Sequence, residues 1–116
     1  MIEETLTTKL LQLRNIFKDG FTIKYNNGNI SQYNNYKYLY IVSYKTVIIV
    51  NTHEITFNVH NIPNKCIIGG WFDIESNKYY IELNYAFDNL KIAKQIGKQY
   101  NQKYVYDLKK DRCIKI

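Results

Sequence analysis

The residues of this 116-residue chain that could do chemistry are few, and their spacing does not assemble a catalytic site. His53-Glu54 begins like a zinc-protease helix motif, but Phe57 stands where that motif needs its second histidine. Asp73 and Glu75 form a carboxylate pair near an expected turn, where such residues more often cap the turn than bind a metal or transfer protons. The sequence also lacks a nucleophile elbow and a glycine-rich phosphate loop. We therefore predict a protein that is not an enzyme and has no catalytic, metal-binding or cofactor-binding residues.

Positive charge is the strongest candidate for a binding determinant, and it is confined to the C-terminal part of the chain. From Lys91 onward there are eight Lys or Arg residues and two Asp residues, which equals the whole net charge of +6. Helical spacing predicts one exposed row of three lysines, here called the lysine ridge: Lys91, Lys94 and Lys98. If a final hairpin lies near this helix, it extends the charge through Lys109, Lys110, Arg112 and Lys115. Such a surface would attract an acidic protein partner or neutralise the phosphates of a nucleic acid. The alternative is that it is an ordinary solvated helix face.

The composition weakens the inference that this positive charge binds nucleic acid. Ile, Lys, Asn and Tyr make up about half of the chain, and Lys outnumbers Arg by 14 to 2. Those four residue types have A/T-rich codons, so the abundance of Tyr and Asn can reflect the coding genome alone. Arginine is the residue that clamps phosphates and reads bases in a bidentate way, and this chain has little of it.

Aromatic residues form two further candidate sites. Tyr36, Tyr38 and Tyr40 alternate along an expected strand over 36–44, so their rings would share one sheet face, as stacking on single-stranded nucleic acid requires. The favoured alternative is that a helix covers this face. Trp71, which follows an expected turn, is either a core residue or an interface hot spot, and the lone tryptophan of a small domain favours the core.

The order of the expected helices and strands, which must position these residues, predicts one α+β domain over residues 1–116. It would have an antiparallel sheet with helices on one face. Apolar spacing predicts a helix over 3–18, with Leu6, Leu10, Leu13 and Phe17 on its buried side. Asn26-Asn27-Gly28 predicts a hairpin turn, and Gly69-Gly70 predicts another turn. We expect strands over 21–25, 29–33, 36–44, 46–50, 55–59 and 79–85, and a last hairpin that pairs 104–108 with 113–116.

A second helix carries the lysine ridge. Asp88 is the expected N-cap, and the helix should run to about Gln102. Its apolar residues fill one arc of about 160° on a helical wheel, opposite the lysines. The residues expected in this buried arc are Leu90, Ile92, Ala93, Ile96, Gly97 and Tyr100.

Other sequence features indicate a protein of the cytoplasm. No apolar run is long enough to span a membrane, and the N-terminus is acidic before it is apolar, which is the reverse of a secretory signal. The two cysteines, Cys66 and Cys113, are therefore expected to be free.

Residues 69–116 resemble small proteins encoded by phages and mobile elements of Firmicutes and related bacteria. The resemblance rests on Gly70, Trp71, Asp73, Tyr79-Tyr80, Asp88, Ala93, Gly97, Gln102 and Tyr106-Asp107-Leu108. Gly20-Phe21-Thr22 also matches, but residues 1–68 otherwise match poorly, and 53–68 indicates strand and loop where the resemblance would place a helix. The shared residues fit structural roles, so no catalytic residue is transferred.

The resemblance implies a phage or mobile-element protein that binds and blocks a bacterial defence component, with an anti-CRISPR role as the sharpest version. The partner would be a protein or ribonucleoprotein in the cytoplasm of the host cell, bound through Lys91, Lys94, Lys98, Lys109, Lys110 and Arg112. The +6 charge argues against mimicry of DNA by an acidic surface. The alternative is a nucleic-acid-binding protein that uses the lysine ridge with Tyr36, Tyr38 and Tyr40. The partner's identity and the oligomeric state stay open.

Overall fold

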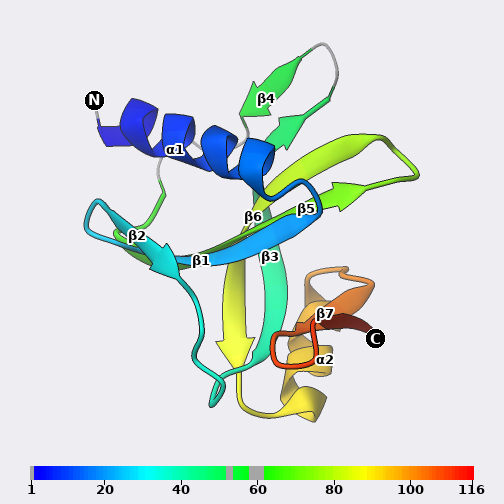
Figure 1. Cartoon of the computed structure of the whole chain (residues 1–116). Coiled ribbons are helices and arrows are strands. Elements are labelled where there is room, and N and C mark those ends of the chain that lie inside the picture. Colours follow the sequence, from blue (N-terminus) through cyan, green and yellow to red (C-terminus); the bar gives the residue numbers. More distant parts are fainter. Residues whose placement is uncertain (1, 52–53, 58–61) are drawn as a thin grey trace.

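The computed structural model describes residues 2–51, 54–57 and 62–116, which form two helices and one antiparallel sheet (Figure 1). The sheet order is β2-β1-β5-β6-β3-β7-β8, and β4 pairs with β3 beside this path. The α+β class predicted from the sequence is confirmed. The elements are α1 (Ile2–Ile16), β1 (Gly20–Asn26), β2 (Asn29–Gln32), β3 (Tyr40–Val50), β4 (Ile55–Phe57), β5 (Lys65–Asp73), β6 (Lys78–Phe87), α2 (Leu90–Gln99), β7 (Tyr104–Asp107) and β8 (Arg112–Lys115).

The larger hydrophobic cluster lies between α1 and the sheet. Leu6 and Leu10 of α1 are buried there, as their spacing predicted. The helix ends at Ile16, so Phe17 leaves the helix and is exposed, contrary to prediction. The backbone carbonyl of Phe17 accepts a hydrogen bond of 2.8 Å from the hydroxyl of Tyr79, which ties the end of α1 to β6. The sheet contributes Ile23, Tyr25, Val47, Ile48, Val50, Ile68, Tyr79, Ile81 and Leu83 to this cluster.

The smaller cluster joins α2 and the final hairpin to the far end of β3. Val42, Ala93 and Val105 are its buried members. β6 contributes side chains from the same face to both clusters. Ile81 and Leu83 belong to the larger cluster, and Phe87 packs against the smaller one. We call the part of the molecule formed by α2, β7 and β8 the C-terminal lobe; it lies at the lower right of Figure 1.

Strand β3 differs from the prediction in both extent and regularity. The strands expected over 36–44 and 46–50 are one strand that begins at Tyr40, with register shifts between Ser43 and Lys45 and between Thr46 and Ile48. Its start is late because residues 35–38 form a turn, in which the Asn35 side chain accepts from the backbone N–H of Lys37 at 3.1 Å. Such local hydrogen bonding competes with strand pairing. The strand expected over 55–59 is seen at Ile55–Phe57, and residues 58–59 lie outside the described part.

The bounds of α2 also differ from the prediction. Asn89, and not Asp88, is the N-cap, since its side chain accepts from the backbone N–H of Ile92 at 3.1 Å. The helix ends at Gln99, and the N–H of Gln102 then bonds the carbonyl of Gly97 at 2.8 Å, which closes the C-terminus instead of extending the helix.

Gly69-Gly70 lies in the middle of β5 and not in a turn, which corrects the prediction. The Phe21 ring from β1 fills the position that a Cβ on Gly70 would take, and the side-chain amide of Asn84 fills that of Gly69. The glycines therefore allow side chains of the neighbouring strands to cross β5. The turn predicted at Asn26-Asn27-Gly28 is confirmed, with positive φ at Asn27 and Gly28.

Replacing Gly70 by alanine should lower the free energy of unfolding by about 1–3 kcal/mol, because the new methyl group overlaps the Phe21 ring. Urea denaturation followed by circular dichroism measures this cost. In a Phe21→Leu background the same Gly70→Ala change should cost clearly less, because the ring is gone. An equal cost in both backgrounds would refute the packing explanation.

Alkaline pH should weaken the attachment of α1. Burial raises the pKa of Tyr79 from 10.0 to about 12, so the folded state holds this proton more tightly than the unfolded state does. The resulting stabilisation is fully present below pH 10 and is lost as the pH rises to about 12. Tyr79→Phe should therefore show a shallower loss of stability over this range in urea denaturation at fixed pH values. Parallel curves for the two proteins would contradict the assignment.

Candidate interaction surface

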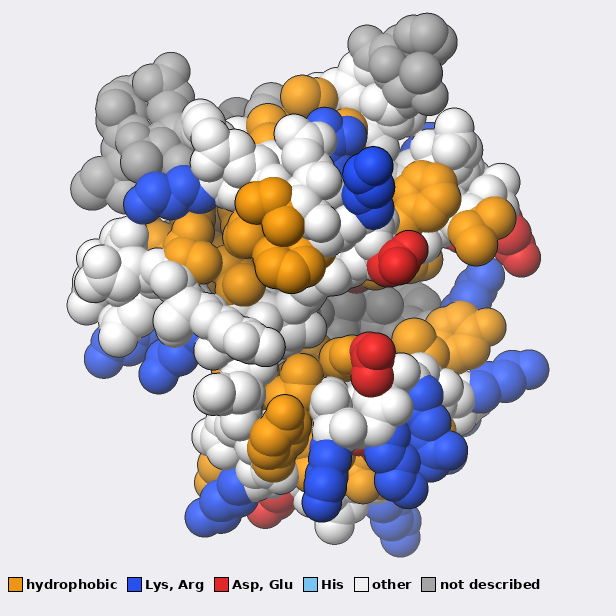
Figure 2. Space-filling view, in the orientation of Figure 1, with side chains coloured by type: hydrophobic (Ala, Val, Ile, Leu, Met, Phe, Trp, Pro, Cys, Tyr) orange, Lys and Arg blue, Asp and Glu red, His pale blue; other side chains and the backbone are white. Residues whose placement is uncertain are grey.

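The C-terminal lobe carries the excess positive charge of the molecule. Figure 2 shows lysine and arginine side chains gathered on the lower part of the molecule, where this lobe lies. Gly97 of α2 comes close to Val42 of β3 and to Ile116, which directly follows β8, so the hairpin packs against the helix. The proximity on which the sequence expectation depended is therefore present.

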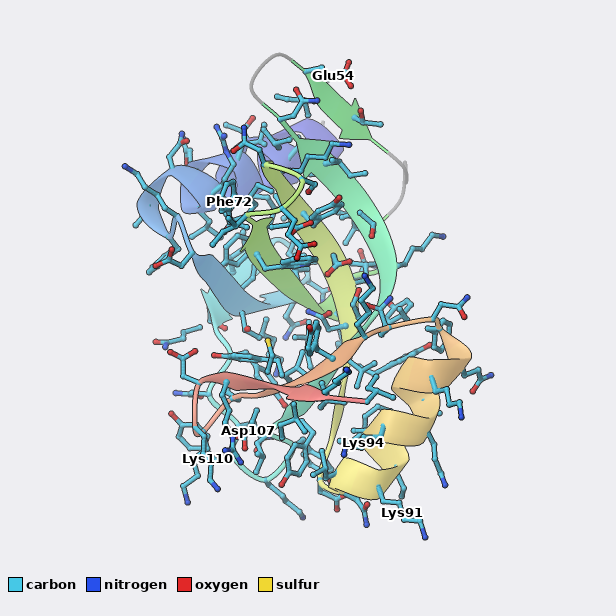
Figure 3. All side chains as sticks on the ribbon, turned by 90° about the vertical axis from the view of Figure 1, so that its right-hand side faces the viewer. Glu54, Phe72, Lys91, Lys94, Asp107 and Lys110 are labelled. Atoms are coloured by element: carbon cyan, nitrogen blue, oxygen red, sulfur yellow. The ribbon has the colours of Figure 1, made fainter. Side chains whose placement is uncertain are left out.

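The basic residues of this lobe form two patches. Lys91 and Lys98 are exposed, whereas Lys94 is half-buried. Figure 3 shows Lys91 and Lys94 on α2 and Lys110 at the hairpin turn on the other side of the lobe. The remaining predicted binding residues, Lys109, Arg112 and Lys115, are exposed. The lysine ridge and the hairpin turn thus lie at separate places on the lobe, with the Lys91 and Lys94 side chains on α2 and Lys110 at the turn.

Both acidic residues of the hairpin serve its turn. The carboxylate of Asp107 is buried and accepts hydrogen bonds of 3.1 Å from the backbone N–H groups of Lys109 and Lys110. The carboxylate of Asp111 accepts from the hydroxyl of Tyr106. Burial and this carboxylate raise the pKa of Tyr106 above its ordinary value. These hydrogen bonds hold both carboxylates of the hairpin at its own residues.

The three tyrosines predicted to share a sheet face do not do so. Tyr36 and Tyr38 are exposed in the loop before β3, and Tyr40 is half-buried against the smaller cluster. The Tyr33 hydroxyl donates to the carbonyl of Tyr38 at 2.7 Å, and the Lys37 ammonium lies 5.5 Å from the centroid of the Tyr38 ring. The predicted alignment of the three rings on one sheet face is therefore wrong, because the strand that would have aligned them begins four residues later.

The favoured prediction that Trp71 is a core residue is also wrong, since its side chain is 43% exposed. Its ring stacks on Tyr80 with a centroid separation of 5.0 Å, and its indole N–H donates to Glu82 at 2.6 Å. The other carboxylate oxygen of Glu82 accepts from the hydroxyl of Thr46 at 3.0 Å. Strand alternation explains the position, because Ile68 and Gly70 face the larger cluster and Trp71 therefore faces away.

An aromatic patch between β6 and α2 was missed by the sequence reasoning. Tyr44 stacks on Tyr85 at 4.1 Å between centroids, and Tyr100 approaches both rings at 6.1 and 5.9 Å. The sequence signals this patch incompletely, because Tyr44 and Tyr85 lie on separate strands and Tyr100 belongs to the predicted buried arc of the helix. Bringing them together needed the pairing of β3 with β6, in which Val42 lies opposite Tyr85.

The remaining chemical candidates fit structural roles. Asp73 caps the β5–β6 turn, accepting from the backbone N–H of Glu75 at 3.2 Å and from the hydroxyl of Ser76 at 2.7 Å. Cys66 and Cys113 are both free thiols. Burial raises the pKa of the Cys66 thiol to about 11, so it is a poor nucleophile at neutral pH.

The described residues hold neither a metal-ligating cluster nor a helix that could span a membrane. In residues 2–51, 54–57 and 62–116, no group of three or more His, Cys, Asp or Glu side chains is placed to hold a metal ion. The zinc-protease-like start at His53 lies outside the described residues. Neither described helix is long and apolar enough to cross a membrane.

Comparisons of the chain with protein-family models, with curated proteins and with solved structures found no match.

Trp71→Phe should lower the free energy of unfolding by about 1–3 kcal/mol, because it keeps an aromatic ring on Tyr80 but leaves a buried oxygen of Glu82 without its donor. Chemical denaturation followed by circular dichroism measures the loss. In a Glu82→Leu background the tryptophan change should cost much less, since no carboxylate is then left unpaired. Additive costs in this double-mutant cycle would argue against the hydrogen bond.

Proposed function

We propose that this chain is a non-enzymatic binding protein of a phage or mobile element, which inhibits a bacterial defence system by stoichiometric association with a protein or ribonucleoprotein. An anti-CRISPR activity is the sharpest form of this proposal. The observation that carries it is the segregation of charge: residues 91–116 hold the full +6 and form one lobe, whereas residues 1–90 are neutral. Charge gathered on one side of a small protein steers association with an acidic partner.

The chemistry of the lobe supports blocking by contact. Lys91 and Lys98 project from a short helix that is anchored through Ala93 and Gly97, so their backbone positions are fixed before binding. Lysine is a point charge and does not form the bidentate fork by which arginine reads bases. The lobe therefore fits an acidic protein surface, or the backbone of a bound guide RNA, better than a specific base sequence.

The association with bacterial defence comes from the resemblance of residues 69–116 to small proteins of phages and mobile elements. Members of that group without enzyme motifs often act by binding and blocking a host protein. The location in the cytoplasm of a host bacterial cell is part of the same proposal.

Charge reversal on the lysine ridge tests the interface. The variant Lys91→Glu/Lys98→Glu should weaken binding to the defence component by about tenfold or more, because it places two carboxylates against an acidic surface. The matched control is Lys9→Glu/Lys18→Glu, which changes the net charge equally at exposed positions of the N-terminal part. The control should change the dissociation constant by less than about twofold, since its charges lie outside the contact.

The biological assay is the plating efficiency of a sensitive phage on strains that each carry one defined defence system. The wild-type chain should restore plating on at least one CRISPR strain, and the lysine-ridge variant should not. Equal rescue by the variant and the wild type would remove the ridge from the interface. No rescue on any strain would remove the proposed inhibition.

Direct nucleic-acid binding is the competing function, and the salt dependence of binding distinguishes it from the proposed inhibition. The exposed Tyr38 with Lys37 over its ring is the feature that favours it. Binding to single-stranded or duplex DNA or RNA would fall steeply with salt, by about one logarithmic unit per phosphate contact for each tenfold rise in salt. Sequence-independent binding that falls in this way, with no effect on any defence strain, would replace the proposal.

A further inference from the structure

Helix α2 packs on the rest of the protein through its smallest residues. Its only buried members among those described are Ala93 and Gly97. The close approach at Gly97 places the helix against Val42 and Ile116, without room for a larger side chain. The buried side of α2 is therefore rotated away from the arc expected from its apolar residues, and Ile92 is left 44% exposed.

The displaced apolar residues form a continuous stripe. Ile92, Ile96 and Tyr100 are spaced four residues apart, so they follow one side of the helix. At its C-terminal end, Tyr100 meets Tyr85 of β6, whose ring centroid lies 5.9 Å away. These four residues are the isoleucine–tyrosine stripe. Tyr85 is 40% and Tyr100 is 38% exposed, so the stripe offers apolar and aromatic surface to a partner.

The stripe and the lysine ridge lie on the same helix. Gln95 and Gln99 are exposed and fall between the two rows when the helix is viewed down its axis. The outer side of α2 is thus apolar along one edge, carries amides in the middle and is cationic along the other edge. This order of an apolar contact beside a charged margin is the usual anatomy of a protein interface.

We propose that the outer side of α2, together with Tyr85, is a docking surface for an acidic amphipathic protein segment. The apolar residues of that segment would contact the isoleucine–tyrosine stripe, and its carboxylates would face Lys91 and Lys98. This rests on the proposed function and deepens it by naming the chemistry of the partner. The charge of the ridge selects an anionic partner, and the exposed side chain of Ile92 with the rings of Tyr85 and Tyr100 selects one that also has apolar side chains.

The same features argue for a protein and against nucleic acid at this surface. Stacking on bases requires aromatic rings with free faces, but the ring of Tyr85 already has a face covered by Tyr44. Isoleucine side chains gain from contact with apolar surface and gain little beside phosphates. Tyrosine is enriched at the centres of protein interfaces, where its ring is apolar and its hydroxyl remains hydrated.

The test uses defined probes and the intact chain. The first probe is a synthetic helical peptide with leucines on one side and glutamates on the other. The second is polyglutamate of the same length, and the third is a single-stranded oligonucleotide of equal charge. Binding is measured by titration, and the contact is located from changes in backbone amide resonances. The peptide should bind more tightly than polyglutamate and the oligonucleotide, and its resonance changes should centre on Ile92, Tyr85 and Tyr100.

Ile92→Asn is the diagnostic variant, and Ile74→Asn is its matched control. Ile74 is 83% exposed in the β5–β6 turn, so the control makes the same chemical change outside the surface. Ile92→Asn should weaken peptide binding by about fivefold or more with its melting temperature unchanged, since half-exposed residues contribute little to folding. Lys91→Glu should weaken binding in a salt-dependent way, whereas the Ile92→Asn effect should persist at high salt.

The proposal is overturned if polyglutamate binds as tightly as the peptide, if the oligonucleotide binds more tightly, or if both asparagine variants behave alike. Sedimentation that shows a dimer broken by Ile92→Asn would assign the surface to a second copy of this chain and would also overturn it. The probes need no defence component. Peptide binding at the stripe without any phage rescue would therefore remove only the proposed function, whereas rescue that survives Ile92→Asn would remove only this inference.

Discussion

The pairing of β3 with β6 is the interaction on which the rest of the structure depends. Val47 and Ile48 of β3 lie in the larger cluster beneath α1, and Val42 of the same strand lies in the smaller cluster beneath α2. Two register shifts separate these halves, and irregularities of this kind bend a strand and increase its local twist. One strand pair therefore holds two clusters together and fixes the orientation of the C-terminal lobe relative to the neutral part of the molecule.

That orientation has a consequence for recognition. A small cluster around Ala93 and Val105 holds the helix and the hairpin, so the charged side chains of the lobe extend from an ordered backbone. Close packing at Gly97 leaves Ile92 of α2 exposed on the same helix as the lysine ridge. The arrangement suits a protein that acts by contact, because charge attracts a partner and exposed apolar area stabilises the complex once formed.

Local sequence patterns predicted most of the helices and strands, and the errors lie where long-range packing or local hydrogen bonds override these patterns. The spacing of Leu6 and Leu10 identified α1, and Asn27-Gly28 identified the first hairpin, because each of these signals acts within a few residues. The strand expected from Tyr36 failed, since the hydrogen bond from Lys37 to Asn35 holds that segment in a turn. Gly69-Gly70 resembled a turn, yet the space that these glycines leave is filled by Phe21 and Asn84 from neighbouring strands. Sequence spacing carries no record of which distant side chain crosses a given strand.

The sequence by itself determined the α+β class, most of the helices and strands, and the confinement of net charge to the last 26 residues. These properties follow from composition and from periods of two or about four residues, which are local. Only the tertiary structure decided which side of α2 is buried and which side of β5 carries Trp71. The first depends on how closely the helix approaches Val42 and Ile116, and the second depends on which face of the sheet meets the core. Both are set by contacts between segments far apart in the chain, which is why the candidate surface on α2 emerged only from the fold.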